Sequence, residues 1–436
     1  MTVLRETTAG NAKRYDGRGA LAVLTGLAAA VLIAPLVSFG PAQAETDSPI
    51  QALLKYRKQA EWTAKFDSAV RGQVAIKSLT PTLSADTATY MEHAITLYKT
   101  IVANGGWPKV PADKVLKLGM KDPNVVKLRQ RLMASGDLRQ STGLSDIYDS
   151  YVGLAVRRFQ LRHGLEADGA AGRSTLTLMN IPAELRLKQL EVNLVRVRAM
   201  AGFLGERYAM VNLPAAEIEA VEAGRVRSRH TAIVGKIDRP SPLINSKIYE
   251  INFNPYWHVP VSIIRKDLIP LMKKEPNYLR DNKIRIYTEK GGEEIKPEDI
   301  DWNTDEATAY LFRQEPGHNN SMGNVRINFH NKHAVYMHDT PTKSVFGKDF
   351  RFESSGCVRV QNVREFVTWI LQGTEDWNRE KVDDIFRKGE RLDVDVKNKV
   401  PIYWVYVTAW ANAEGIVHFR EDIYNRDGLS TNTALR

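Results

Sequence analysis

A single cysteine, Cys357, constrains how this 436-residue chain can fold more than any other residue. One thiol cannot form a disulfide within the chain, so the domains must be held together by hydrophobic cores rather than by disulfide bonds. An internal disulfide is therefore excluded as the purpose of Cys357. Two interpretations remain: a small buried apolar residue, which is common for cysteine in general, or a reactive thiol.

The first 44 residues have the pattern of a secretory signal. Four basic residues flank the start of an uncharged apolar run, Ala20–Val37, and the small-residue pattern Ala42-Gln43-Ala44 comes after it. We expect residues 1–44 to be a signal peptide that is cleaved after Ala44, with export to the periplasm of a Gram-negative envelope. The alternative is an uncleaved membrane anchor, because the apolar run approaches the ~20 residues that span a bilayer. In an oxidising compartment a free thiol is a liability unless it performs chemistry.

The net charge of the chain limits the kinds of partner that it is expected to bind. The first 44 residues hold four basic and two acidic side chains, so residues 45–436 keep a formal charge of +8 out of the +10 of the whole chain. This charge suits a partner that bears carboxylates, while export argues against nucleic acid.

Hydrophobic periodicity predicts a multidomain α+β chain in which helices come first. We expect a helical N-terminal scaffold region (45–117), a three-helix module (118–181) in which Asp122 caps the first helix, and a connector helix (182–206). A mainly β domain comes next at 207–412. Residues 260–312 interrupt it with a helix that Ser262 caps and with polar loops, and residues 413–436 form a C-terminal tail. The expected strands are Tyr208–Leu213, Thr231–Val234, Ile248–Phe253, Ile284–Tyr287, Val325–Phe329, Ala334–His338 and Ile402–Val407.

Two short segments of the β domain hold the candidate catalytic residues. In a strand over 334–338, Tyr336 and His338 would share one face while the two apolar residues between and before them point to the core. Asp339-Thr340-Pro341 ends that strand, and fifteen residues, 339–353, separate His338 from a loop that lies before a helix with Asn362 as its expected N-cap. The loop and the short run after it read Ser354-Ser355-Gly356-Cys357-Val358-Arg359-Val360.

These residue types fit the needs of an acyl transfer to a thiol. A thiol titrates near ~8.5, so a nucleophilic cysteine needs a partner such as His338 that takes its proton and later returns it to a leaving amine. The anionic tetrahedral intermediate needs donors, which backbone N–H groups in a tight turn can supply. Gly356 permits backbone dihedrals that a side chain would forbid. Arg359 offers a forked donor for a substrate carboxylate.

The two segments resemble the signature of the L,D-transpeptidase catalytic domain (YkuD type): a histidine, a spacer, then Ser/Thr-His-Gly-Cys-x-Asn/Arg. Residues 118–181 resemble the peptidoglycan-binding domain type 1. The module order is similar to that of the long Gram-negative branch, in which the catalytic domain carries an inserted cap. The matching segments are Tyr208–Leu213, 235–242, Asn252–Pro260 and Gly317–Gly323 for the catalytic domain, and Leu128–Leu132, 155–160, 164–165, 168–169, Gly172 and Thr175 for the binding module.

The resemblance implies roles for individual residues. Cys357 would be the nucleophile and His338 its base, and Tyr336 and the backbone at Gly356 would border the oxyanion site. Arg359 would position the donor peptide.

The two serines before the glycine, Ser354 and Ser355, would lie at the substrate. Ser355 departs from the signature, which usually has histidine there. A hydroxyl can donate one hydrogen bond, but it cannot titrate near neutrality.

The resemblance also implies a reaction. A donor tetrapeptide of peptidoglycan would acylate the cysteine and release D-alanine, and an acceptor stem would resolve the thioester to give a 3→3 cross-link, without a cofactor or metal. This is a role in cell-wall organisation and cell shape, with peptidoglycan and other cell-wall synthesis enzymes as partners, no nucleic acid, and the membrane only through an uncleaved N-terminus. Carbapenems are expected to acylate the same thiol.

Several alternatives remain open on the sequence alone. An L,D-carboxypeptidase or amidase would use the same dyad to hydrolyse stems. A scaffold that binds peptidoglycan without catalysis is a second possibility, and the three-helix module could be a spacer that has lost its affinity for glycan. A metal site at His330, His333 and His338 is a further rival, although a single strand would point His333 away from the other two.

Overall fold

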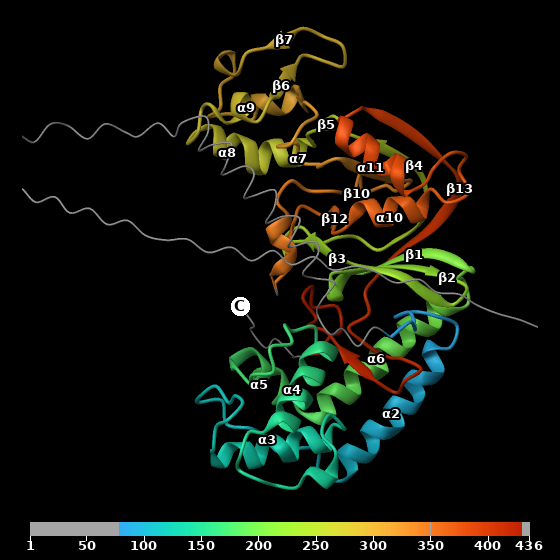
Figure 1. Ribbon diagram of the computed structural model, residues 1–436. Coiled ribbons are helices and arrows are strands. Elements are labelled where there is room, and N and C mark those ends of the chain that lie inside the picture. Colours follow the sequence, from blue (N-terminus) through green and yellow to red (C-terminus); the bar gives the residue numbers. More distant parts are fainter. Residues whose placement is uncertain (1–77, 349, 430–436) are drawn as a thin grey trace, which may run out of the picture. The chain divides into compact units, whose positions relative to one another are not determined.

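The computed structural model describes residues 78–348 and 350–429, and these belong to one compact unit (Figure 1). The predicted signal peptide and its cleavage site lie outside the described residues. Within the described part, none of the helices has the length and apolar character that crossing a membrane requires.

Helices form the first part of the described chain. The long helices α2 (Thr87–Ala103) and α6 (Ala183–Ala201) lie against each other and bury Met91 and Leu190 in a shared core. Between them in sequence, α3 (Pro123–Ala134), α4 (Ser150–Arg162) and α5 (Arg173–Met179) enclose a core of their own. Asp122 caps α3 as predicted, because its carboxylate accepts the N–H of Asn124 at 2.9 Å. The three-helix pattern of the sequence is therefore confirmed as local structure.

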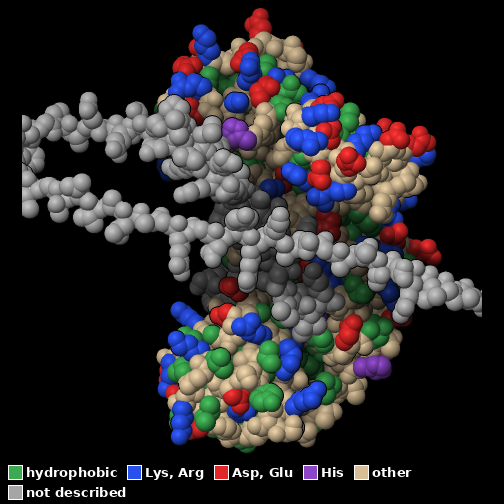
Figure 2. Space-filling view, in the orientation of Figure 1, with side chains coloured by type: hydrophobic (Ala, Val, Ile, Leu, Met, Phe, Trp, Pro, Cys, Tyr) green, Lys and Arg blue, Asp and Glu red, His purple; other side chains and the backbone are tan. Residues whose placement is uncertain are grey.

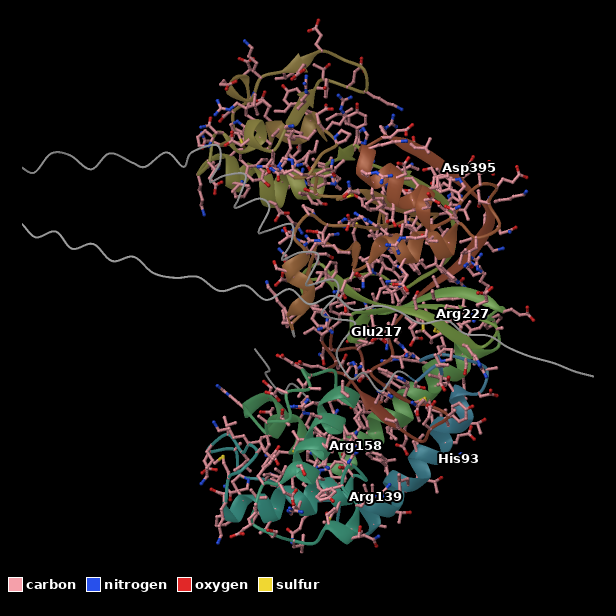
Figure 3. All side chains as sticks on the ribbon, viewed as in Figure 1. His93, Arg139, Arg158, Glu217, Arg227 and Asp395 are labelled. Carbon is pink, nitrogen blue, oxygen red and sulfur yellow. The ribbon has the colours of Figure 1, made fainter. Side chains whose placement is uncertain are left out.

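A nine-stranded sheet forms most of the second part. Its order is β11-β3-β12-β10-β9-β4-β13-β1-β2, and a further pairing of β3 with β2 closes eight of the strands into a ring. Glu217 and Arg227, labelled in Figure 3, lie on the antiparallel pair β2–β3. The strands are β1 (Arg207–Asn212), β2 (Glu217–Glu222), β3 (Arg225–Gly235), β4 (Ile244–Phe253), β9 (Val325–Phe329), β10 (Met337–His338), β11 (Phe352–Ser354), β12 (Val358–Val360) and β13 (Leu392–Val405).

The largest core lies between this sheet and the helices α10 (Val363–Ile370) and α11 (Arg379–Lys388). Val363, Phe366, Val367 and Ile370 form the apolar face of α10 and are buried there. The predicted capping by Asn362 is wrong in detail. Asn362 does precede the helix, but its φ of 52° is left-handed and its side chain makes no cap hydrogen bond. An N-cap side chain reaches the helix N–H groups from an extended backbone, which this residue does not have.

The strand expected at 334–338 is shorter than predicted. Only Met337 and His338 form β10, because Ala334 adopts a left-handed φ of 53° and the Asn331 side chain holds both backbone groups of Val335. The predicted alternation still holds, since Val335 and Met337 lie in the large core.

The insertion at 260–312 is more regular than the polar loops predicted from the sequence. Strands β5 (Trp257–His258), β6 (Ile284–Tyr287), β7 (Glu294–Ile295) and β8 (Leu311–Gln314) form a separate sheet in the order β5-β8-β6-β7. Ile284 and Ile286 alternate into a core of the insertion's own, with helical turns beside it. Those turns are α7 (Val261–Ile263), the π-helical turn Ile264–Leu268, α8 (Ile269–Met272) and α9 (Tyr278–Asp281).

The first helix of the insertion also begins differently from the prediction. Pro260 occupies its N-cap position, whereas the sequence suggested Ser262. Figure 2 shows basic side chains interspersed with acidic ones over the insertion rather than gathered in one patch on this face.

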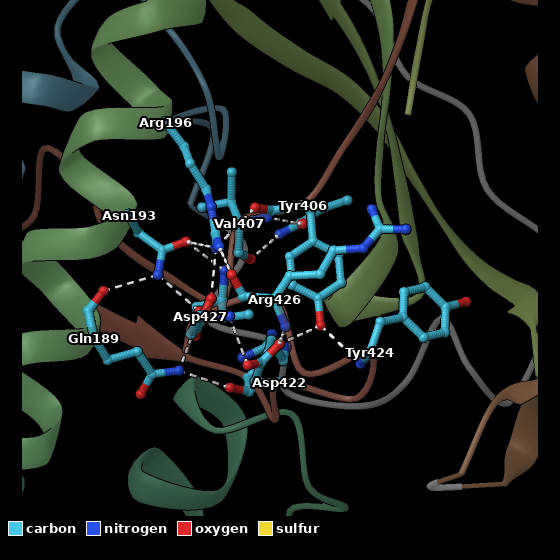
Figure 4. Close-up of polar contacts among 12 residues, drawn as sticks. Gln189, Asn193, Arg196, Tyr406, Val407, Asp422, Tyr424, Arg426 and Asp427 are labelled. Carbon is cyan, nitrogen blue, oxygen red and sulfur yellow. Dashed lines mark hydrogen bonds and ion pairs between the residues drawn. The ribbon is translucent and has the colours of Figure 1, made fainter. Parts of the chain in front are cut away.

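The chain after β13 folds back onto α6. Residues 409–419 form a hairpin of β14 (Ala409–Ala411) and β15 (Val417–Phe419), so the domain end expected at 412 lies in its turn. Two aspartates that follow the hairpin bind earlier parts of the chain (Figure 4). Asp427 pairs with Arg196 of α6, and Asp422 accepts a hydrogen bond from the Tyr406 hydroxyl at 2.6 Å. The described part of the predicted tail is therefore packed into the structure.

Candidate active site

The predicted catalytic segments lie side by side in the sheet. Strands β10 and β12 are parallel, with His338 opposite Arg359. At the start of these two strands, the N–H of Val358 donates to the carbonyl of Tyr336 at 3.2 Å. This bond places Cys357, the residue before Val358, next to Tyr336. The register partners Met337 and Val358 both lie in the large core, so the residues that alternate with them project from the opposite face. The sheet thus brings the four predicted side chains to one face.

The turn before Cys357 is held by hydrogen bonds to two serines. The Ser354 hydroxyl accepts the N–H of Gly356 at 3.2 Å and donates to the carbonyl of Cys357 at 2.5 Å. The buried Ser241 hydroxyl donates to the carbonyl of Gly356 at 2.9 Å and accepts the N–H of Gly235 at the same distance. Gly356 has a φ of 112°, a conformation that favours glycine, as the sequence predicted.

These bonds fix the direction of the Cys357 amide. In a trans peptide the C=O and the next N–H point in opposite directions, so the bond from Ser241 to the Gly356 carbonyl turns the Cys357 N–H away from Ser241. Within the described part of the chain no acceptor is recorded for that N–H. The Gly356 N–H, in contrast, is already engaged by Ser354.

The thiol and the imidazole are both neutral near pH 7. Burial raises the pKa of Cys357 to about 11, although Tyr336, Arg326 and Arg359 act in the opposite direction. Burial, with Arg359 and Arg326 adding repulsion, lowers the pKa of His338 to about 3. No hydrogen bond is recorded between the two side chains among the described residues.

The His338 ring has a defined tautomer when neutral. Its Nδ1 lies 2.6 Å from the carbonyl oxygen of Asp339, and a carbonyl can only accept a hydrogen bond. The Asp339 carbonyl thus favours the neutral tautomer with its proton on Nδ1, which leaves Nε2 to take a proton, and a backbone group of Ser321 also lies close enough to the ring to raise its pKa.

Tyr336 joins the site to the insertion. Its ring lies edge-on to the His338 ring, with centroids 5.8 Å apart, and it belongs to the core of the insertion, against which Cys357 also packs. Burial raises the pKa of Tyr336, and the neighbouring Cys357 adds to the shift, so the hydroxyl stays protonated and can donate.

Ser355, which the resemblance places at the substrate, is exposed and contacts a side chain from another loop. Its hydroxyl accepts a hydrogen bond from Arg239 at 3.0 Å, and the same guanidinium pairs with Asp267 of the insertion. The turn that carries Cys357 is thereby connected to the insertion.

The sequence analysis missed Arg326. It lies on β9 opposite His338, and its guanidinium carbon sits 4.4 Å from the centroid of the Tyr336 ring. The signal was present, because the strand Val325–Phe329 was predicted and alternation puts Arg326 on the polar face.

The three histidines considered as a metal site are not gathered. His330 stacks on Tyr249 with ring centroids 4.4 Å apart, His333 is exposed, and Nδ1 of His338 faces a carbonyl oxygen. Within residues 78–348 and 350–429, no group of three or more His, Cys, Asp or Glu side chains is arranged to hold a metal ion.

Comparison with known families agrees with this architecture. Residues 206–383, which include His338 and Cys357, match the family described as the L,D-transpeptidase catalytic domain (YkuD). Residues 121–179 match a family described as a candidate peptidoglycan binding domain. The chain therefore carries an L,D-transpeptidase catalytic domain, preceded by a peptidoglycan-binding type 1 domain.

Individual relatives are more distant. A Haemophilus influenzae protein named as a candidate L,D-transpeptidase is 30% identical over 241 residues, which cover 55% of this chain and 48% of that protein. This chain thus spans about half the length of that relative. A solved L,D-transpeptidase of Stackebrandtia nassauensis is 12% identical, with 71% of this chain and 100% of that one covered and a TM-score of 0.24. One of Mycobacterium smegmatis is 13% identical, with 46% and 58% covered and a TM-score of 0.22.

Proposed function

We propose that this protein is a peptidoglycan L,D-transpeptidase that forms 3→3 cross-links through a thioester on Cys357. The observation that carries the proposal is the register of β10 and β12, which sets Tyr336 and His338 beside Cys357 and Arg359 on one polar face. These residues lie inside the region that matches the L,D-transpeptidase catalytic domain. The preceding peptidoglycan-binding domain and the net positive charge favour the same polymer as substrate.

The first step acylates the enzyme. His338 Nε2 takes the thiol proton as the Cys357 sulfur attacks the carbonyl between diaminopimelate and the terminal D-alanine of a donor stem. The oxyanion is stabilised by the Cys357 N–H and by the Tyr336 hydroxyl. Collapse of the intermediate breaks the C–N bond, and His338 gives the proton to the departing amine of D-alanine.

The second step transfers the acyl group. The side-chain amine of an acceptor stem attacks the thioester, loses its proton to His338 and leaves an amide, and the Cys357 thiol is restored. Water can attack in place of the amine, which would make the enzyme an L,D-carboxypeptidase.

The Cys357 thiol and the His338 imidazole are both neutral before substrate binds. Because the thiol and the imidazole are not joined by a hydrogen bond, they must approach each other when substrate binds. Such tightening is common in catalytic sites that are compared with and without substrate. Cys357 is then deprotonated in step with the attack, rather than stored as a thiolate.

The insertion at 260–312 serves as a cap over the thioester. Two contacts support this: the insertion's core includes Tyr336 and reaches Cys357, and Asp267 is tied through Arg239 to Ser355. A cap that excludes water favours the amine acceptor over hydrolysis. A peptidoglycan substrate also sets the place of action in the cell envelope, where the predicted signal peptide would deliver the chain to the periplasm.

A carbapenem tests the proposal without any peptidoglycan substrate. Its strained amide is an electrophile that takes the place of the donor peptide, so intact-protein mass spectrometry should show a single adduct. The Cys357→Ala variant is the control, since this is the only cysteine of the chain. An adduct of equal yield on that variant would refute the assignment of the nucleophile.

A further inference from the structure

Two arginines flank His338 across the sheet. Arg326 on β9 and Arg359 on β12 are the register partners of His338 on its two sides, so all three side chains project from the same polar face. Both arginines are half-buried. Two positive charges therefore stand beside an imidazole that is itself neutral.

Among the described residues, neither arginine has a carboxylate partner. No ion pair or hydrogen bond is recorded there for the side chain of Arg326 or Arg359, and the Nε atom of each is buried without a partner. Other buried arginines hydrogen-bond to the protein: Arg162 pairs with Asp137, Arg131 donates to the carbonyl of Met179, and Arg186 donates to Gln189. A guanidinium group that is partly removed from water without an anion is costly, and it is a strong receptor for an anion that arrives.

The order of the strands indicates which part of a bound substrate would lie near each arginine. The sequence across the sheet is β12, β10, β9, so the side chains run in the order nucleophile and Arg359, then His338, then Arg326. In the proposed reaction the acyl group stays on Cys357, and the leaving amine takes its proton from His338. A leaving group that continued in the same direction would reach β9.

We propose that Arg326 binds the carboxylate of the departing D-alanine. In this amino acid the carboxylate carbon is two bonds from the nitrogen that His338 protonates, and one strand spacing of about 4.8 Å separates His338 from the backbone of Arg326. A guanidinium offers a planar fork that matches a carboxylate. This assignment rests on the proposed function, and it makes the enzyme select stems that end in a free D-amino acid.

The contact between Arg326 and Tyr336 suggests a second possible role for Arg326, and the experiment must distinguish it from carboxylate binding. The Arg326 guanidinium lies over the Tyr336 ring, so the arginine could act only by packing against that ring. A packing role affects every donor equally. Recognition of a carboxylate affects only donors that carry one.

The test measures binding to the full chain in the Cys357→Ala background, where no turnover occurs. Two peptides are compared by calorimetry: a stem tetrapeptide that ends in diaminopimelate–D-alanine, and the same peptide as the D-alaninamide. With Arg326 present, the carboxylate peptide should bind on the order of 10- to 100-fold more tightly, the range of a charge-assisted hydrogen bond. Adding Arg326→Met should reduce that preference to about threefold or less.

Two further variants serve as controls. Arg313→Met removes an arginine that also stacks on tyrosine rings, Tyr256 and Tyr287, but already pairs with Glu315, and it should keep the full preference. Arg326→Lys retains the charge without the fork and should keep part of the preference, which gives a readout if Arg326→Met does not fold.

The outcomes are distinct. An equal loss of binding for both peptides in Arg326→Met, an unchanged preference, or no preference with Arg326 present would each overturn the proposal. Turnover by the unmodified enzyme tests the proposed function separately, so a failure of one is distinguishable from a failure of the other.

Discussion

The N–H of Val358 donates to the carbonyl of Tyr336 across two parallel strands, at 3.2 Å. This one backbone contact sets the register of the site, because it places Cys357 beside Tyr336 and Arg359 beside His338. The proposed base, His338, is thus part of a strand, and the proposed nucleophile and donor hydroxyl, Cys357 and Tyr336, lie directly before the two paired strands, which suits a reaction that depends on preorganised groups.

The pH dependence of thiol reactivity is set by the raised pKa of Cys357. With a pKa of about 11, the thiolate fraction is small at pH 7 and grows tenfold for each pH unit up to about pH 10. The rate of alkylation by iodoacetamide should therefore rise about 100-fold between pH 7 and pH 9. The single thiol makes the reading unambiguous. A rate that is already level across this range would mean a preformed thiolate and would contradict the neutral pair.

Ser241 should matter for the rate more than for substrate binding. Ser241→Ala removes the donor to the Gly356 carbonyl, so the peptide that carries the Cys357 N–H is no longer held in one orientation. We expect kcat to fall about tenfold with little change in KM, and the free energy of unfolding to fall by about 1–2 kcal/mol.

Ser246→Ala is the matched control for that prediction. Ser246 also donates to a carbonyl, that of His330 at 2.7 Å, but in an exposed position away from Cys357. Its kcat should stay within about twofold of the parent. Equal effects of the two substitutions would exclude a specific role for Ser241.

The cap is tested through its ion pair with the catalytic domain. Asp267→Ala should loosen the insertion from Arg239 and so raise the ratio of hydrolysed to cross-linked product about threefold or more, because water gains access to the thioester. Asp305→Ala is the control, since its partner Arg265 lies within the insertion. If neither substitution, nor replacement of Val261–Asp301 by a Gly/Ser linker, changes the product ratio, the cap proposal is wrong.

Much of the fold could be predicted because it depends on patterns among residues that are close in the sequence. Ile284–Tyr287 and Val325–Phe329 are strands with the predicted bounds, and Asp122 caps its helix as its position suggests. These features depend on alternation or on neighbouring residues. Hydrophobic periodicity predicted the multidomain α+β architecture, and the matches over 121–179 and 206–383 confirm it.

The parts that were not predicted depend on distant residues. Ser241 and Arg239 reach the nucleophile turn from a loop more than 100 positions earlier in the chain, and no spacing in the sequence reveals such a contact. Arg326 was visible as a polar position of a strand, but its partner His338 became known only with the register of β9 and β10. The left-handed Ala334 shortened a strand whose composition had favoured it, because backbone conformation there is set by the loop that Asn331 ties together.

The most direct test of the proposed reaction is turnover of defined muropeptides, with the products measured by mass. The mature protein should join two tetrapeptide stems into a 3→3 linked dimer and release one D-alanine for each link. Cys357→Ala should form no product, and His338→Ala should form it about 100- to 10,000-fold more slowly, the usual contribution of a general base. Full activity of the Cys357→Ala variant would contradict the mechanism at its centre.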